Sequence, residues 1–108
     1  MTRAGIAVSQ GRIIVAVIIN DSVQVNRVKS LNEVKDILNT AKPDIVGVDK
    51  SAADLFEDLS FSFNTIKIDG ENEDSSPVKS LTMLSITKDS DKAAINSAYY
   101  SKEAGSDN

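Results

Sequence analysis

The sequence predicts a single α/β domain in the order β-β-β-α-β-α-β-α, with a five-stranded mixed sheet that carries helices on its faces. Three observations predict it. A length of 108 residues suits one hydrophobic core. The first third consists of short β-branched runs separated by tight turns. From residue 30 onward, apolar residues at helical spacing alternate with short apolar runs.

The first three strands follow from composition and alternation. Residues 4–8 are small and apolar, residues 12–19 are rich in β-branched side chains, and residues 22–28 alternate between apolar and polar positions. The alternating strand should have one buried face and one solvated face. Ser9-Gln10-Gly11 and Asn20-Asp21-Ser22 supply tight turns, so the three strands are expected to form an antiparallel meander.

A helix and a buried strand follow the meander. Ser30 and Glu33 have the spacing of a capping box, and Lys42-Pro43 ends the helical pattern. Between them the apolar residues recur at helical spacing: Leu31, Val34, Ile37, Leu38 and Ala41. Residues 44–49 are a continuous apolar run bounded by acids, which is typical of a parallel strand buried on both faces. This strand should lie in the middle of the sheet.

The second half of the chain continues the alternation. Residues 51–59 are predicted to form a short helix with Ser51 as its cap, and residues 61–68 are predicted to form another strand. Ser76-Pro77 has the cap-then-proline pattern of a helix start. A further helix is expected to begin near Ser90 with four residues facing inward: Ala93, Ala94, Ala98 and Tyr99.

The arrangement of these elements follows from general rules of topology. Right-handed β-α-β crossovers should set the first strand beside the fourth, with the third and fifth strands at the sheet edges. Residues 69–76 are predicted to be a solvated acidic loop. The predicted domain spans residues 1–100, and residues 101–108 are expected to form a disordered tail because the chain becomes polar there.

The composition narrows the classes of function. The chain has no Cys and no His, which excludes disulfides, thiolate nucleophiles, imidazole bases and metal sites built from these residues. Twelve Lys and Arg against 16 Asp and Glu give a net charge of −4, opposite to the balance expected of a general nucleic-acid binder. The longest uncharged apolar run, residues 13–19, is too short to cross a membrane. A cytoplasmic protein without membrane association is expected.

Three segments add a resemblance to a known family. Gly5-Ile6-Ala7-Val8-Ser9 and residues 13–17 are similar to a first hairpin that usually reads Gly-Ile-Asp-Pro-Gly in that family. Residues 42–49 are similar to its fourth strand, which ends in an acid, and residues 89–94 with Ala98-Tyr99 to its C-terminal helix, which carries the last acid. Together with the order of elements, these segments resemble the ribonuclease H-like superfamily, in its Holliday junction resolvase-like branch of predicted nucleases.

The resemblance implies a carboxylate site that holds divalent metal ions. Phosphodiester hydrolysis without His or Cys typically uses two Mg²⁺ ions about 4 Å apart, held by carboxylate oxygens. In the family, the acid on the first strand bridges both ions, but this position is Ala7 here. A methyl group cannot bind a metal, so the site is predicted to be degenerate at its centre.

Asp49 matches the fourth-strand acid, and Asp89 or Asp91 matches the last one. Asp49 and Asp91 are therefore the candidate metal ligands. The alternative for all three is structural: Asp49 marks a strand end beside a helix start, and Asp89 and Asp91 precede a helix, where acids are common caps. Asp21 lies at the far end of the second strand and is not expected to reach the site.

The preferred hypothesis is a non-catalytic ribonuclease H-like interaction or assembly module that needs no cofactor. Its expected partner is another protein or a second copy, because unpaired sheet edges are sites of strand addition. The alternative is a nuclease dependent on Mg²⁺ or Mn²⁺ that uses Asp49, Asp89 and Asp91, with a rearranged carboxylate site or one completed by a second subunit. A third hypothesis, binding of a small ligand or nucleotide at the strand ends, has no phosphate-binding motif to support it.

Overall fold

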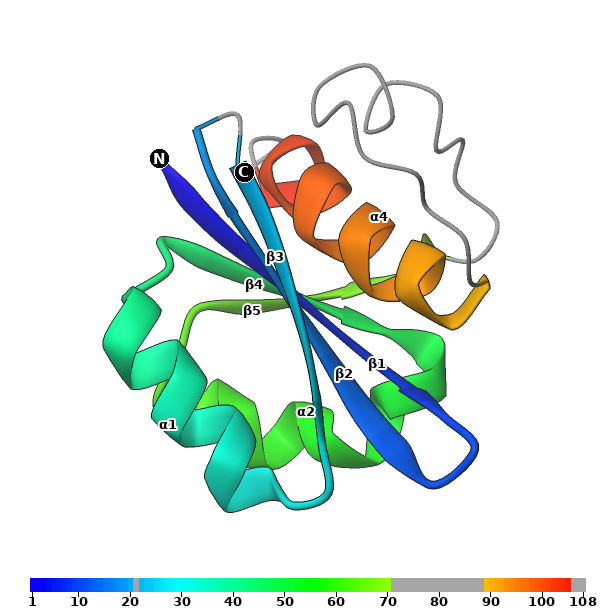
Figure 1. Ribbon diagram of the computed structural model, residues 1–108. Coiled ribbons are helices and arrows are strands. Elements are labelled where there is room, and N and C mark those ends of the chain that lie inside the picture. The colour runs from blue at the N-terminus through cyan, green and yellow to red at the C-terminus, as the bar shows by residue number, and fades with distance from the viewer. Residues whose placement is uncertain (21, 71–88, 106–108) are drawn as a thin grey trace.

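The computed structural model describes residues 1–20, 22–70 and 89–105, with side chains described over residues 92–101 in the last range. Five strands form one mixed sheet in the order β3-β2-β1-β4-β5 (Figure 1). The predicted α/β class and strand arrangement are confirmed. The elements are β1 (Thr2–Ser9), β2 (Arg12–Ile19), β3 (Ser22–Val28), α1 (Leu31–Ala41), β4 (Ile45–Asp49), the 3₁₀ turn η1 (Lys50–Ala52), α2 (Ala53–Ser60), β5 (Thr65–Ile68) and α4 (Asp89–Gly105).

Tight turns and crossovers produce this order. Gln10 and Gly11 both have positive φ, 52° and 75°, which is the backbone of the two-residue turns that join antiparallel strands. β1 pairs antiparallel with β2, and β2 with β3. β4 lies parallel to both β1 and β5, because α1 and α2 carry the chain back between successive strands. β3 and β5 are the two edges of the sheet, as expected.

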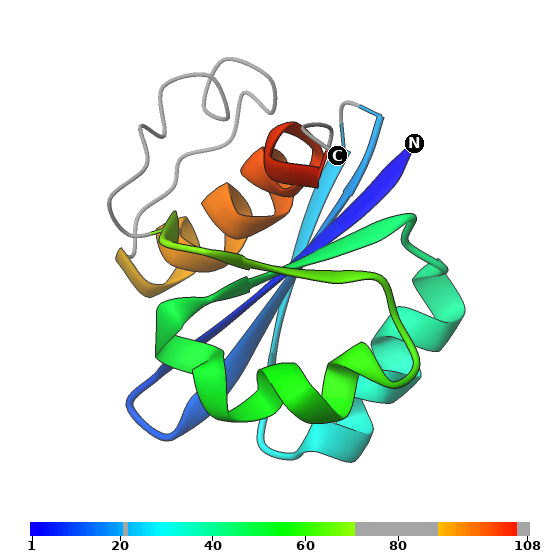
Figure 2. The same cartoon turned by 180° about the vertical axis from the view of Figure 1, so that it is seen from behind.

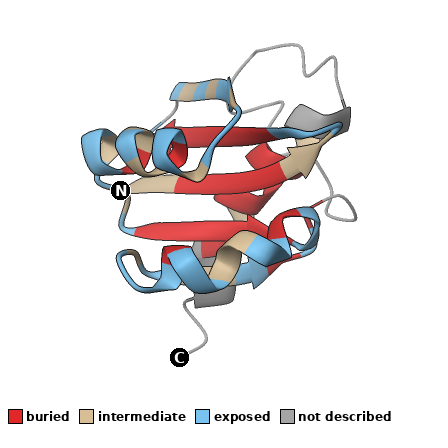
Figure 3. Cartoon of the chain, turned by 90° about the horizontal axis from the view of Figure 1, so that it is seen from below, coloured by how far each residue is buried: buried red, intermediate tan, exposed pale blue. Residues whose placement is uncertain are grey.

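The helices form layers on opposite faces of the sheet. α1 and α2 cover one face and α4 covers the other (Figures 1 and 2). Alternation along β1 and β2 sends successive side chains to the two sides, so each face has its own apolar cluster. The central strands are therefore buried along most of their length (Figure 3).

The capping box at α1 forms as predicted. The Ser30 hydroxyl accepts a hydrogen bond from the Glu33 N–H, and the Glu33 carboxylate accepts from the N–H groups of Lys29 and Ser30 at 2.8 and 2.9 Å. Lys42 closes the other end in the left-handed region at φ 51°, and its N–H donates to the Leu38 carbonyl. The helix thus begins and ends where its sequence indicates.

α4 packs against the sheet at backbone distance. A Cβ at Gly5 would lie 2.0 Å from the carbonyl oxygen of Ala94, and a Cβ at Gly47 would lie 2.0 Å from that of Ser97. Because Gly5 and Gly47 have no side chain, the backbone of α4 packs directly against the backbone of β1 and β4. Ala93, Ala94 and Ala98 are buried in this contact, as predicted.

The structure corrects three expectations. The fifth strand begins at Thr65 rather than residue 61, because the Ser62 and Phe63 N–H groups both donate to the Leu59 carbonyl and continue the end of α2 as a turn. Phe61 is consequently 81% exposed. The helix predicted over residues 51–59 with Ser51 as its cap is instead the turn η1, capped by Asp49, followed by α2, whose N-cap is Ala52. The expected tail at residues 101–108 is helical as far as Gly105, and Ser101 is fully buried.

Other expectations lie outside the described residues. These are Asp21, the acidic loop beyond Gly70 and the helix expected from Ser76-Pro77. No helix in the described ranges combines the length and the apolarity that crossing a bilayer would need.

Candidate functional site

The structure brings Ala7 and Asp49 together at the ends of β1 and β4. In this parallel pair Ile6 is opposite Val48, so Ala7 and Asp49 are the next positions in register. Gly5 and Gly47 face α4, and Ala7 and Asp49 each come two residues after one of them. Because side chains alternate along a strand, Ala7 and Asp49 also lie on the α4 face of the sheet. The resemblance predicts that the acids on the first and fourth strands lie side by side in this way.

Ala7 lies in an apolar environment. It is 1% exposed and belongs to the cluster formed with Ile14, Ala93 and Ala94. The first-strand position is therefore filled by a methyl group that packs against β2 and α4. The Ala7 side chain offers no oxygen atom to a metal ion.

The Asp49 carboxylate is surrounded by hydrogen-bond donors. Asp49 is almost completely buried, with 1% of its surface exposed. One oxygen, Oδ2, accepts hydrogen bonds from both the Ser51 N–H, at 3.0 Å, and the Ser51 hydroxyl. The other oxygen, Oδ1, accepts from the Gly70 N–H at 2.8 Å. Both oxygens are thus committed to groups of this chain, as burial of a carboxylate requires.

These bonds continue into a network that joins four elements. The Val8 N–H at the end of β1 donates to the Ser51 hydroxyl oxygen at 3.0 Å. Beyond β5, the Gly70 carbonyl accepts from Asn96 Nδ2 in α4, also at 3.0 Å. Asp49 therefore connects the ends of β1, β4 and β5 with α4, and it serves as the N-cap of η1.

The residues described at this position do not fit a two-metal site. The donors around Asp49 are N–H and O–H groups, which compete with a cation for the same lone pairs. Ala7 supplies no ligand atom. Within the ranges described, no three acidic side chains lie close enough to hold a metal ion together. No step of phosphodiester chemistry can be derived from these residues.

The remaining acids are placed only by their backbone. Asp89 and Asp91 lie in the first turn of α4, and their side chains are outside the described part of the chain. Their predicted roles as catalytic or metal-binding residues therefore stay predictions. For Asp49, the contacts favour the alternative that the acid is a structural cap. For Asp89 and Asp91, no side-chain contacts are described.

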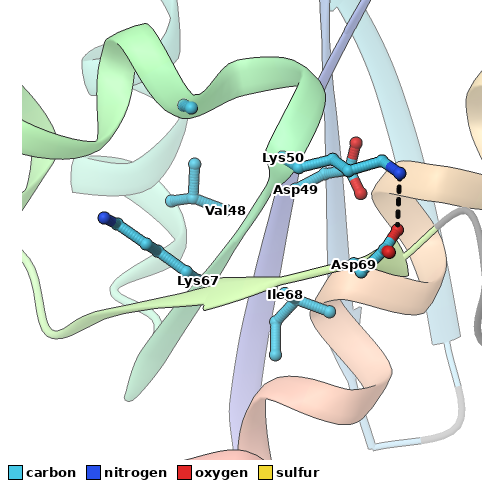
Figure 4. A pocket seen from close by; sticks show the side chains of 7 residues that line it. Val48, Asp49, Lys50, Lys67, Ile68 and Asp69 are labelled. Atoms are coloured by element: carbon cyan, nitrogen blue, oxygen red, sulfur yellow. Dashed lines mark ion pairs between the residues drawn. The ribbon is translucent and has the colours of Figure 1, made fainter.

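A small pocket lies at the carboxyl ends of β4 and β5, the edge where open α/β sheets usually bind ligands. Its volume is about 290 Å³. Figure 4 shows the side chains that line it. Its walls are mainly apolar, and its two cations already have partners: Lys50 pairs with Asp69 at 3.5 Å, and Lys67 lies over the Phe56 ring at 4.9 Å. The lining residues are Val48, Asp49, Lys50, Ala53, Lys67, Ile68 and Asp69.

A larger groove of about 480 Å³ lies on the same face of the sheet, toward the β3 edge, between α1 and the β2–β3 hairpin. Its floor comes from the strands and its wall from the helix. The lining residues are Val17, Ile19, Gln24, Asn26, Asp36, Ile37, Thr40 and Ala41. Ile19 is 39% exposed, which is unusual for a large apolar side chain in this molecule.

Sequence reasoning missed the partners of Asp49. Ser51 follows Asp49 by two residues, a spacing at which an aspartate side chain often accepts a hydrogen bond from the backbone in turns. The contact with the Ser51 N–H could therefore have been predicted from the sequence. Gly70 and Asn96 are 21 and 47 positions away, and no local pattern connects them to Asp49. The pairing of β5 with β4 brings Gly70 to the site, and the packing of α4 brings Asn96.

The strand order 3-2-1-4-5 with interleaved helices is consistent with a ribonuclease H-like fold. Comparison of this chain with protein-family models, with curated proteins and with solved structures found no match.

Proposed function

We propose that this chain is a non-catalytic ribonuclease H-like domain of the resolvase-like type that acts as an interaction or assembly module. The observation that carries the proposal is the surroundings of Ala7 and Asp49 at the ends of β1 and β4. Ala7 is packed among apolar side chains, and both oxygens of Asp49 accept hydrogen bonds from Ser51 and Gly70. A site that had to exchange metal ions would need these oxygens for the cation.

The charge of the molecule supports a protein partner over a nucleic acid. Its net charge is −4. Proteins that follow a phosphate backbone need a cluster of cations, roughly one for each neutralised phosphate. In the described ranges Lys50 and Lys67 are engaged with Asp69 and Phe56. The two sheet edges, β3 and β5, offer main-chain groups that another polypeptide can pair with.

A cleavage assay tests the absence of catalysis. Purified protein is incubated with branched DNA and with an RNA–DNA hybrid in millimolar Mg²⁺ or Mn²⁺, beside Asp49→Asn and the exposed-site control Asp58→Asn. The proposal predicts no cleavage above the buffer control for any of the three proteins.

Metal-dependent cleavage that Asp58→Asn retains and Asp49→Asn loses would overturn the proposal and establish the nuclease alternative. A circular dichroism spectrum of each variant under the same conditions ensures that a loss reflects the carboxylate and not unfolding.

A further inference from the structure

The β3 edge has the features of a strand built to pair. β3 is seven residues long and pairs one-to-one with β2 without a bulge, from Ile13 opposite Val28 to Ile19 opposite Ser22. Exposed edges are usually protected by proline, bulges or several charges. β3 has no proline or glycine, and Arg27 is its single charged residue. The other edge, β5, is only four residues long.

The sequence of β3 is complementary to itself in one register. Full overlap of two antiparallel copies is symmetric about Val25, which then lies opposite Val25 of the second copy. On the α4 face this pairs the two half-buried Val25 side chains and sets Val23 opposite Arg27 of the second copy. On the other face it sets Gln24 opposite Asn26 of the second copy, and amide side chains can donate to and accept from each other.

Charge disfavours registers centred near Arg27. With Val25 at the centre, the two Arg27 positions lie four residues apart along the paired strands, or roughly 13 Å at the rise of a β-strand. This exceeds the screening length of about 8 Å at physiological ionic strength. A register centred on Arg27 would instead bring the two guanidinium groups opposite each other, which is unfavourable.

The groove beside β3 adds apolar surface to this edge. A two-fold axis perpendicular to the sheet keeps both α1 helices on one face, so the two grooves meet across the axis. Gln24 and Asn26 lie on the groove floor, and Ile19, Ile37 and Ala41 supply apolar area next to them. The pocket beside β5 is smaller, at about 290 Å³, and four of its seven lining residues are charged.

We propose that β3 pairs antiparallel with β3 of a second copy about Val25, which makes one ten-stranded sheet across the dimer. This inference rests on the proposed function, because it names the partner and the surface of the assembly module. A single strand pair beside a shallow groove is a small interface, and two copies each carry a charge of −4. We therefore expect a reversible dimer with micromolar dissociation, typical of small interfaces.

Charge substitutions at Gln24 and Asn26 test the register directly. Both side chains are exposed, so the fold should tolerate the changes. The double variant Gln24→Lys, Asn26→Lys sets like charges opposite each other at two symmetry-related places. Gln24→Lys, Asn26→Glu sets opposite charges there. Asn32→Lys, Asn39→Lys on the exposed side of α1 is the matched control for added charge.

Sedimentation equilibrium measures the dimer dissociation constant of each protein at physiological ionic strength, with thermal melts as the check on folding. We expect wild type and the control to dimerise alike. Like charges should weaken the dimer on the order of tenfold, and opposite charges should restore it, because each cross-strand charge pair contributes a few tenths of a kcal/mol or more.

A wild-type chain that stays monomeric at several hundred micromolar would overturn the inference, and so would a dimer that both lysine substitutions leave unchanged. Either result leaves the proposed function standing if the cleavage assay is negative, since another protein can then be the partner. Metal-dependent cleavage lost in Asp49→Asn would instead refute the proposed function.

Discussion

At the residue scale, a buried carboxylate is tolerated only where donors surround it, and Asp49 has three of them. The same acid at a strand end is what a metal site in this kind of fold would present. The donors, rather than the identity of the residue, distinguish the two cases. Asp49 is best understood as a connector between β4, η1 and the segment after β5.

The connector role predicts a cost in stability. Asp49→Asn replaces one acceptor oxygen by an amide that faces N–H or O–H donors, so we expect the free energy of unfolding to fall by about 2 kcal/mol. Ser51→Ala should cost roughly 1–2 kcal/mol, because it removes one Asp49 contact and the acceptor for the Val8 N–H. Urea denaturation measures both.

The exposed acid Asp58 provides the control, since Asp58→Asn should change stability by less than about 0.5 kcal/mol. Equal stability of the Asp49 and Asp58 variants would mean that the network contributes nothing to folding.

Glu33 predicts a dependence on pH. Hydrogen bonds from the Lys29 N–H and then from the Ser30 N–H and hydroxyl lower the pKa of the Glu33 carboxyl below its ordinary value. A depressed pKa in the folded state stabilises the fold above the unfolded pKa and loses this effect as the pH falls through the folded pKa. Wild type should therefore exceed Glu33→Gln in stability at neutral pH, and the difference should shrink under acid.

Denaturation midpoints of the two proteins from pH 7 to about pH 3 measure this difference. A gap that stays constant over the whole range would show that the charge of Glu33 has no part in the cap.

At the scale of elements, the approach of α4 to the sheet depends on glycine. Gly47→Ala would place a methyl group 2.0 Å from the Ser97 carbonyl oxygen, and backbone cannot move aside as a flexible side chain can. We expect a loss of about 3 kcal/mol or more in the free energy of unfolding.

Gly11→Ala is the comparison, because its Cβ would meet nothing within 4 Å. The only cost expected there is backbone strain, since Gly11 has φ +75°. Its cost should be about 1 kcal/mol. Similar losses for the two variants would contradict the close packing of α4.

Local patterns predicted the elements well where side chains carry the signal. Alternation in residues 22–28 and the capping box at Ser30 predicted β3 and α1 with the bounds that they have. Phe61 and Phe63 imitated the alternation of a strand, but the Leu59 carbonyl accepts two hydrogen bonds and extends the helix end as a turn. The polar residues after Tyr100 suggested a tail, yet Ser101 continues α4 and is small enough to be buried between this helix and Gly47 of β4.

At the scale of the whole molecule, the candidate site shows what local patterns leave out. Topology rules predicted that the first strand lies beside the fourth, and the resemblance placed Ala7 and Asp49 at one end of this pair. Neither predicted the contact of Gly70 with Asp49, which depends on the register of β5 and on the packing of α4 against the segment after it. The hydrogen bonds that Asp49 makes thus depend on tertiary packing, which local patterns do not contain.

Paramagnetic relaxation by Mn²⁺ tests this central claim most directly. In amide spectra of the labelled protein titrated to millimolar Mn²⁺, our account predicts that the signals of Ala7, Asp49 and Gly70 broaden no more than those of exposed acidic surface residues such as Asp58. Selective broadening of Ala7, Asp49 and Gly70 at low metal concentration, absent in a folded Asp49→Asn variant, would contradict it and identify a working metal site at the end of β1.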